Sequence, residues 1–300
     1  MADPTPPTMH WGAEALWQQL VPLLPGLSVE VVHTTRSTNT ALLERARAAP
    51  DTSAGGLDAI VRPSVESGAF GRRAVDLQPC LLVAEHQTAG RGRQGRAWHS
   101  VLGASLTFSL ALPLAIADWS GLSLAIGVAL AEALDDAPDG APRIGLKWPN
   151  DLWLLGAPSA TRKLGGILIE TVAAGAQRLA VIGIGLNVQP FEPVEANTGF
   201  APLHELDSAA TAPAVLARIA LPLVRALKQF EREGFAPFAA RFAARDALVG
   251  RNVTTTLPEV TQGIARGVSA KGELLVQTDT GIVSVASGEV SVRLGRPGGA

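Results

Sequence analysis

Cysteine is almost absent from this 300-residue chain, which contains only Cys80. A single thiol excludes an internal disulfide and a metal site built from several cysteines, and it fits a reducing compartment. We expect Cys80 to be a small, buried, apolar side chain. Histidine is also scarce, and its spacing does not predict a structural zinc site. The five histidines lie far apart, at His10, His33, His86, His99 and His204.

Neither sign of charge is in clear excess. The sequence has 25 Lys and Arg against 27 Asp and Glu, for a net charge of -2, so no overall field attracts nucleic acid and any anion site must be local. Long apolar runs are missing too, and the N-terminus lacks the basic and apolar segments of a signal peptide. We therefore expect a cytoplasmic protein with no membrane partner. Its 47% hydrophobic content suffices for one large domain and a small one.

The most informative segment that is present covers residues 90–98, Gly-Arg-Gly-Arg-Gln-Gly-Arg-Ala-Trp. Glycine lets backbone N–H groups approach a phosphate closely, arginine binds it with two hydrogen bonds, and an indole face stacks on a purine or another flat ligand. The segment therefore predicts a loop that grips an anionic nucleotide, with a solvated surface loop as the alternative. His86 and His99 flank this loop, and they are the two histidines for which we expect a function beyond that of a surface or core residue.

The glycines at positions 90, 92 and 95 also satisfy the dinucleotide-binding pattern G-x-G-x-x-G. That pattern should open a helix, yet residues 103–110 are patterned as a strand, and arginine occupies positions that are uncharged in a Rossmann turn. A kinase glycine loop does lie between strands, but neither His-Arg-Asp nor Asp-Phe-Gly follows it. We therefore disfavour both interpretations.

Apolar periodicity predicts a chain of mixed helices and strands. Helices are expected over residues 11–24, 41–46, 120–137 and 211–234, the last interrupted or kinked near Pro222. Strands are expected over 29–32, 81–85, 103–110, 143–151, 163–170 and 179–188. Pro149 should stop the strand at 143–151 and leave Asn150 and Asp151 at its exit.

The remaining segments have weaker or different patterns. Residues 1–10 are rich in proline and predicted to be disordered. Residues 48–79 are predicted to be a surface insertion with a brief strand at 57–61, because unstructured connections of that length are uncommon inside a domain. After about residue 249, short β-rich runs broken by glycine predict a small barrel.

Ser37, Thr38 and Asn39 precede the short predicted helix at 41–46. A hydroxyl at this position can cap the helix, and the free N–H groups at its start can face a ligand. Capping alone is the simpler interpretation.

Five motifs then occur in a specific order along the chain. They are Ser37-Thr38-Asn39, Gln87 with the glycine–arginine loop, Lys147-Trp148-Pro149-Asn150-Asp151, Arg162-Lys163-Leu164-Gly165-Gly166-Ile167-Leu168, and Gly183-Ile184-Gly185-Leu186-Asn187. In this order the chain resembles the biotin protein ligases over roughly residues 29–293. The resemblance implies an α+β fold with a mixed or antiparallel central sheet and flanking helices, of the class II synthetase-like type, followed by a small SH3-like β-barrel. It also implies an N-terminal extension (1–28), a biotin- and ATP-binding catalytic domain (29–248, with the insertion at 48–79) and a C-terminal barrel (249–300).

The resemblance further implies the reaction and the residues that carry it. Biotin and ATP would give biotinyl-AMP with Mg²⁺, and a lysine of a biotin carboxyl carrier protein would then take the biotinyl group. Lys163 would be the catalytic cation, with Arg91, Arg93 and Asp151 as further catalytic residues. Asp151 could act as a base, a Mg²⁺ ligand or a structural cap. The binding residues would be Ser37, Thr38, Asn39 and Gln87 for biotin, Gly90, Arg91, Gly92 and Arg93 in the loop, Arg96 and Lys147 for phosphate, Trp98 for adenine, and Asn150, Lys163, Gly166 and Asn187 near the nucleotide.

Two departures from the family and two rival functions complete the prediction. Only 36 residues precede Ser37, which is too few for a winged-helix domain, so we expect no specific DNA binding. The sequence leaves the oligomeric state open, with a weak homodimer as one alternative. The insertion at 48–79 is longer than the family's usual connection.

A lipoyl ligase or transferase shares the fold, but its Arg-Arg-x-Ser-Gly-Gly-Gly loop and nearby His-Asp are missing. A noncatalytic biotin-binding regulator is the other rival, against which Lys163 and Asp151 argue.

Overall fold

The structure is a computed structural model that describes most of the chain. The described residues are 9–48, 77–135, 140–156, 162–174, 177–192, 199–257, 260–286 and 293–294. Of residues 1–10, which were predicted to be disordered, 1–8 lie outside them. The strand predicted at 57–61 also lies outside them, as does the insertion apart from its two ends.

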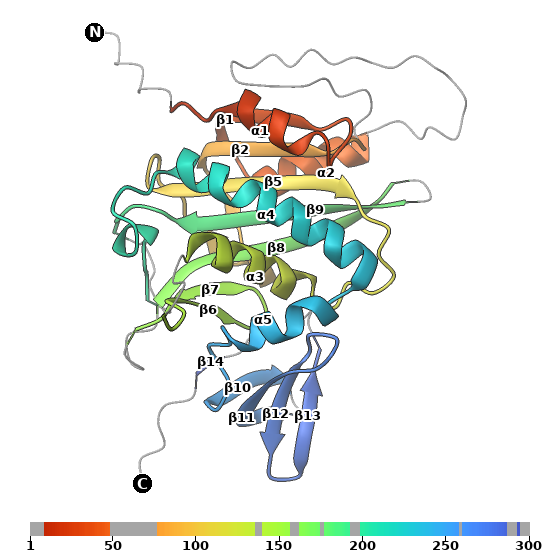
Figure 1. Ribbon diagram of the computed structural model, residues 1–300, viewed down its shortest axis with the longest axis vertical. Helices are drawn as coiled ribbons and strands as arrows, with labels where there is room; N and C mark the ends of the chain where they lie inside the picture. Colours follow the sequence, from red (N-terminus) through yellow and green to blue (C-terminus); the bar gives the residue numbers. More distant parts are fainter. Residues whose placement is uncertain are drawn as a thin grey trace.

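A seven-stranded mixed sheet forms the centre of the molecule (Figure 1). Its order is β1 (Ser28–Thr35), β2 (Cys80–Gln87), β5 (Ser105–Pro113), β9 (Gln177–Asn187), β8 (Arg162–Ala174), β7 (Asp151–Leu154) and β6 (Ile144–Lys147). Strands β1 and β2 pair in parallel, and all other neighbours are antiparallel. This arrangement confirms the mixed sheet expected from the sequence.

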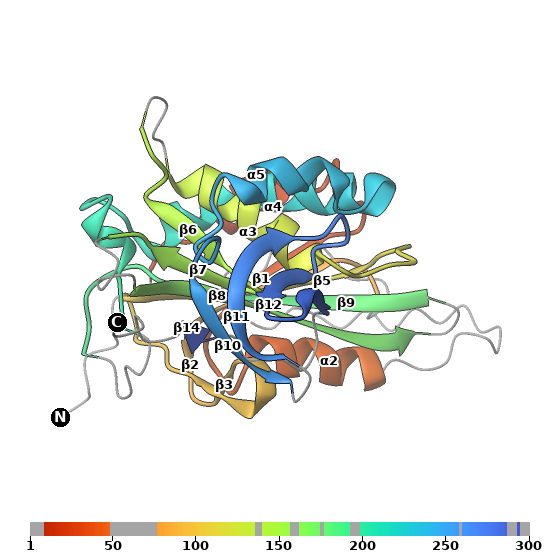
Figure 2. The ribbon, with the colours of Figure 1, turned by 90° about the horizontal axis from the view of Figure 1, so that it is seen from below.

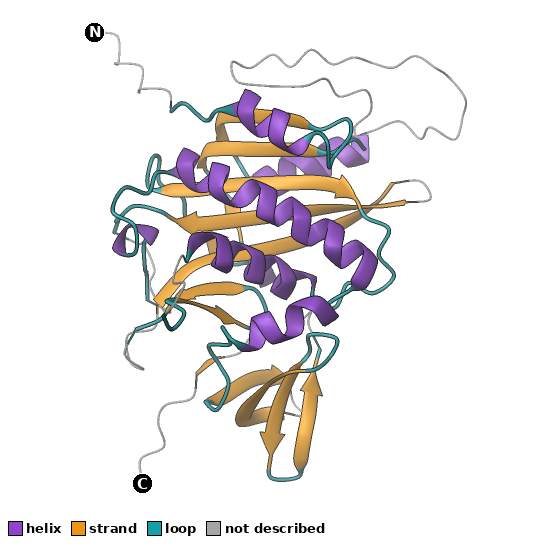
Figure 3. Ribbon diagram, viewed as in Figure 1, coloured by secondary structure: helices purple, strands orange, loops and turns teal. Residues whose placement is uncertain are grey.

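Helices cover both faces of this sheet. One face carries α1 (Ala13–Leu20), α3 (Leu122–Leu134), α4 (Ala212–Glu233) and α5 (Ala239–Ala243), whereas α2 (Thr38–Ala48) lies on the opposite face (Figures 2 and 3). Strand β2 is accordingly buried along nearly its whole length, and Cys80 at its start is fully buried, as predicted. Among the described residues, no helix combines the length and apolar character that crossing a bilayer requires.

Helix α4 corrects one expectation. It runs through Pro222 without interruption, and Thr211 caps its start by accepting a hydrogen bond from the Ala214 N–H at 3.4 Å. Proline removes a helical hydrogen bond, but Ile219 and Leu223 on either side are buried in the core. Tertiary packing therefore keeps the helix continuous.

The strand predicted over residues 143–151 is also wrong in extent. Strand β6 ends at Lys147, the chain reverses through a turn that contains cis-Pro149, and Asp151 opens β7 directly opposite Lys147. Proline has no N–H for the ladder, so the segment forms a hairpin turn instead of a strand end. The consequence is that Lys147 and Asp151 are cross-strand neighbours.

The C-terminal part forms a second, antiparallel sheet below the first (Figure 1). Its order is β13 (Gly281–Val285), β12 (Leu274–Thr278), β11 (Val260–Val268), β10 (Asn252–Leu257) and β14 (Arg293–Leu294), consistent with the predicted SH3-like barrel. The buried Trp148 side chain joins the two sheets by donating its indole N–H to the Gly272 carbonyl at 2.9 Å. The proposed domain boundaries at residues 28 and 248 stay predictions.

Candidate active site

The start of α2 forms a buried polar cradle with β2. Ser37 Oγ accepts the Thr40 N–H at 3.4 Å, which is the predicted cap. Gln87 Oε1 accepts the backbone N–H of Thr38 at 2.7 Å and its hydroxyl at 3.2 Å. Ser37, Thr38, Asn39 and Gln87 are all buried, so the structure brings together the four residues predicted to bind biotin. We call these four residues the cradle.

Two residues that the sequence analysis missed complete this cradle. Ser109 Oγ lies 2.6 Å from both Thr38 Oγ1 and Asn39 Oδ1, and Glu170 Oε2 accepts the Asn39 Nδ2–H at 2.9 Å. A signal for Ser109 exists in the sequence, because Ser105, Thr107 and Ser109 place polar groups at every second position of a buried strand. Glu170 gave no local signal.

The glycine–arginine segment folds as a small hairpin next to the cradle. It consists of β3 (Gly90–Arg91), a 3-10 turn (Arg93–Gly95) and β4 (Ala97–Trp98). Gln94 and Gly95 both have positive φ, 55° and 72°, which explains a glycine at position 95. This hairpin is called the loop below.

The loop arginines have different partners. Arg91 forms an ion pair with Glu170, and Arg93 donates to Asn150 Oδ1 at 3.4 Å. Burial lowers the pKa of Arg93 from its usual value, an effect that Asp151 opposes and Arg96 reinforces. Arg96 donates a hydrogen bond from Nη2 to Gln94 Oε1 at 3.5 Å. Arg93 is thus a partly desolvated cation beside the Asn150–Asp151 segment.

Lys163 and Asp151 form an ion pair, with 2.8 Å between Nζ and Oδ1. The same Nζ lies 5.8 Å from the centroid of the Trp98 ring, within reach of a cation–π contact. Gly166 lies beside this pair, since an added Cβ would be in van der Waals contact with the Lys163 ammonium at 3.4 Å and with Asp151 Oδ1 at 3.5 Å. The pair is therefore packed between Trp98 and the Gly166 backbone.

Neighbouring amides hold this region in place. Asn187 donates from Nδ2 to the Lys163 carbonyl at 3.1 Å, and Asn150 donates to the Ile167 carbonyl at 2.7 Å. Lys147 Nζ lies 4.8 Å from the centroid of the Trp153 ring. Trp153 was not predicted as a site residue.

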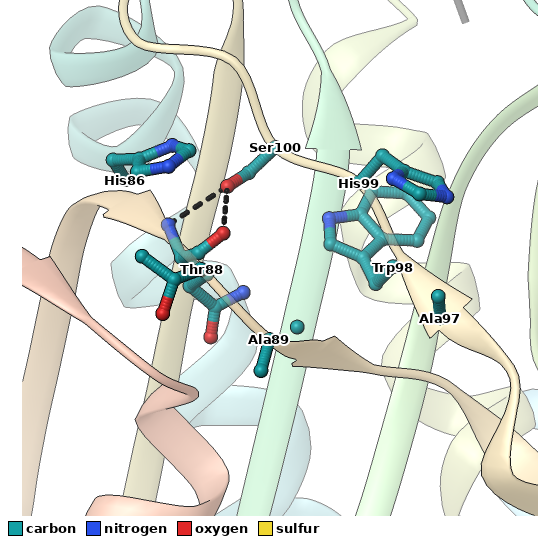
Figure 4. A pocket seen from close by; sticks show the side chains of 9 residues that line it. His86, Thr88, Ala89, Ala97, Trp98, His99 and Ser100 are labelled. Atoms are coloured by element: carbon teal, nitrogen blue, oxygen red, sulfur yellow. Dashed lines mark hydrogen bonds between the residues drawn. The ribbon is translucent and has the colours of Figure 1, made fainter. Parts of the chain in front are cut away.

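A pocket of about 290 Å³ opens beside the loop (Figure 4). Gln87, Gly90 and Trp98 line it, and both His86 and His99 contribute to its walls. Ser100 Oγ fixes the Gln87 backbone by accepting its N–H at 2.8 Å and donating to its carbonyl at 3.2 Å (Figure 4). A flat ligand with polar edges could thus contact Gln87 of the cradle and Trp98 together.

The described residues contain no group of three or more His, Cys, Asp or Glu that could hold a metal ion by themselves. Mg²⁺ commonly needs only one or two carboxylates when substrate phosphates supply the other oxygens. Asp151 is the carboxylate beside Lys163 and fits that limited role.

Fold and site together define an α+β protein with a polar cradle at the start of α2, an arginine loop that forms its own two-stranded sheet, and a lysine–aspartate pair on the central mixed sheet. Comparison with known families agrees with this class. Residues 77–187 match the Biotin/lipoate A/B protein ligase family, and residues 248–293 match the Biotin protein ligase C terminal domain.

Known proteins resemble the chain over most of its length. A Mycobacterium tuberculosis biotin--[acetyl-CoA-carboxylase] ligase is 34% identical over 289 residues, covering 93% of this chain and 91% of that protein. The Escherichia coli bifunctional ligase/repressor BirA is 38% identical over 217 residues, 70% of this chain and 65% of that protein. This chain therefore spans slightly less than two thirds of the length of that bifunctional relative.

A solved structure gives the same result. The biotin protein ligase from Aquifex aeolicus in complex with biotin and ATP superposes with a TM-score of 0.67 at 27% identity, covering 89% of this chain and 99% of that one. The chain belongs to the biotin protein ligase family.

Proposed function

We propose that this chain is an ATP-dependent biotin protein ligase. In the first step an oxygen of the biotin carboxylate attacks the α-phosphorus of ATP, and the bond from that phosphorus to the bridging oxygen of pyrophosphate breaks. In the second step the amine of an acceptor lysine attacks the carbonyl carbon of biotinyl-AMP, AMP leaves, and the amine loses a proton. The observation that carries the proposal is the Lys163–Asp151 pair beside Trp98, on the same central sheet as Gln87 of the cradle.

The cradle would hold biotin. Hydroxyl and amide side chains both donate and accept hydrogen bonds, as a ureido group with one carbonyl and two N–H groups requires. Ser37, Thr38, Asn39 and Gln87 supply such groups in a buried setting. The acceptor Gln87 Oε1 is already fixed by Thr38, so the cradle needs little rearrangement to bind.

Lys163 would stabilise the charge that develops as the carboxylate meets the α-phosphate. Positioned cations often supply the largest single contribution to such a step. Asp151 would orient the Lys163 ammonium in the first step. In that step, with ATP bound, it could also help to hold Mg²⁺, which would neutralise charge on the phosphates. In the second step it would take the proton of the acceptor amine.

The loop would close over the activated intermediate. Arg91, Gly92 and Arg93 would cover the adenylate, since a reactive anhydride must be kept from water and stray amines. Gly90 permits the close approach of the loop strands, because a Cβ there would lie 3.3 Å from the Trp98 carbonyl carbon. Trp98 would pack beside the adenine. Asn150, Gly166 and Asn187 would lie near the nucleotide, and Arg96 and Lys147 would meet its phosphates.

The acceptor would be a biotin carboxyl carrier protein. The match of residues 248–293 to the C-terminal domain of biotin protein ligases supports this reading over the lipoyl ligase or transferase. Three further statements stay predictions: a cytoplasmic location, the absence of specific DNA binding, and a weak homodimer. The net charge of -2 favours the absence of DNA binding.

Isotope exchange between pyrophosphate and ATP tests the proposal. Because adenylate formation is reversible, labelled pyrophosphate should enter ATP when biotin is added and not when lipoate or octanoate replaces it. Exchange that is faster with lipoate would support the rival ligase. Biotin binding without any exchange would support the noncatalytic regulator.

A further inference from the structure

One oxygen atom of Glu170 connects the loop to the cradle. Glu170 lies on β8, and its Oε2 accepts hydrogen bonds from Arg91 Nη2 of the loop and from Asn39 Nδ2 of the cradle, the latter at 2.9 Å. The Arg91 and Glu170 side chains are 42% and 28% exposed. The atom is thus shared by two segments that are far apart in the sequence and both belong to the proposed biotin site.

Glu170 also helps to determine which way the Asn39 amide faces, together with the Leu168 carbonyl, which accepts from the same Nδ2 at 3.3 Å. A carboxylate accepts hydrogen bonds but donates none, so the Asn39 NH₂ group must point towards Glu170. Its Oδ1 then faces Ser109 Oγ at 2.6 Å. The space around this amide is tight, because a Cβ on Gly183 would lie 2.9 Å from Asn39 Cγ. An amide held at both ends presents one fixed pattern of donors and acceptors.

We propose that Glu170 is a positioning residue that couples closure of the loop to the order of the cradle. It holds Arg91, and hence the loop, only while it also holds Asn39 in the orientation that the cradle uses. Glu170 is not a catalytic residue, since it acts through Arg91 and Asn39. This inference rests on the proposed function, because it concerns retention of the intermediate formed at that site.

Two substitutions separate the two contacts of Glu170. Glu170→Gln keeps an oxygen that can accept from Asn39 but removes the charge that attracts Arg91. We expect its KM for biotin to stay within about twofold of wild type, while release of biotinyl-AMP rises about two- to fivefold, the range for a half-exposed ion pair. Glu170→Ala removes both contacts, so both the KM and the release should rise.

Release is measured as biotin transfer to an unrelated lysine-rich protein, with each variant matched to wild type for its rate of pyrophosphate production. The matched control is Glu132→Gln, which breaks the similarly exposed ion pair between Glu132 and Arg241 on the helical face. That control should leave both readouts unchanged. Hydrogen exchange over residues 88–98 in the presence of biotin should rise in Glu170→Gln and not in the control.

A double-mutant cycle with Arg91→Met tests the coupling directly. If Glu170 acts on retention through Arg91, the double variant Arg91→Met/Glu170→Gln should release no more intermediate than Arg91→Met alone. Release factors that multiply, or wild-type retention in Glu170→Gln, would overturn the inference. A wild-type chain without biotin-dependent pyrophosphate exchange would instead overturn the proposed function, so the two failures are distinguishable.

Discussion

Replacing Lys163 by methionine removes one positive charge and keeps most of the apolar stem. The Lys163 ammonium lies 2.8 Å from Asp151 Oδ1, and its side chain is 28% exposed. Loss of one preorganised group that faces a developing charge typically slows a reaction by about 10²–10³, or about 2.7–4 kcal/mol. Because Asp151 already neutralises part of the charge, we expect a fall of about 10² in adenylate formation.

The effect on folding should be much smaller. The pair is partly exposed, and such ion pairs contribute about 0–1 kcal/mol. We therefore expect the unfolding temperature of Lys163→Met to change by no more than about 4 °C. A loss of activity with the fold intact would assign the effect to chemistry.

Pyrophosphate release at saturating ATP and biotin is the assay, with biotin affinity measured separately by calorimetry. Lys228→Met is the matched control, because Lys228 pairs with Glu231 on α4, away from the site. The control should be as active as wild type. Turnover of Lys163→Met within about threefold of wild type would refute the catalytic role, since it corresponds to less than about 0.7 kcal/mol.

Three further predictions follow from single contacts. In Gly185→Ala the added Cβ would lie 2.7 Å from Trp98 Nε1 and displace the indole. Because Trp98 is proposed to pack beside the adenine, the KM for ATP should rise about tenfold while the KM for biotin changes little. Equal changes in both KM values would contradict this placement of Trp98. Trp148→Phe removes the bond to the Gly272 carbonyl, which should lower the free energy of unfolding by about 1–3 kcal/mol in urea titrations, and an unchanged midpoint would show that the contact is not stabilising. Burial raises the pKa of Asp246, so the stability that its protonation confers is present at low pH and is lost as pH rises through the raised value. Asp246→Asn should therefore unfold at a higher temperature than wild type at about pH 7 and not at about pH 3, and the opposite order would refute the assigned cause.

The sequence predicted the order of the elements, because apolar periodicity is a local property. The site residues that the short motifs indicated stay predictions, although the structure brings several of them together. The sequence could not predict that Asp151 opens a strand opposite Lys147, since a proline after an apolar run marks an end and does not reveal the turn that follows. It also did not indicate Glu170 as a site residue, because Glu170 accepts its hydrogen bond from Asn39, which is 131 positions away in the sequence. Such partners are set by strand register in the folded sheet, and only the structure supplies that register.

The helix α4 shows the complementary case. Proline inside a helical pattern predicts a lost hydrogen bond and an interruption. The helix is nevertheless continuous, because the residues around Pro222 are buried in the core. Local propensity is a weak guide wherever core packing opposes it.

Transfer of biotin to a carrier protein is the most direct test of the central claim. The purified chain is incubated with ATP, Mg²⁺, biotin and a biotin carboxyl carrier domain, and the intact mass of the acceptor is recorded. Our account predicts the gain of a single biotinyl group on one lysine, which is lost when that lysine is replaced by arginine. An acceptor whose mass stays unchanged, although the chain binds biotin and ATP, would contradict it.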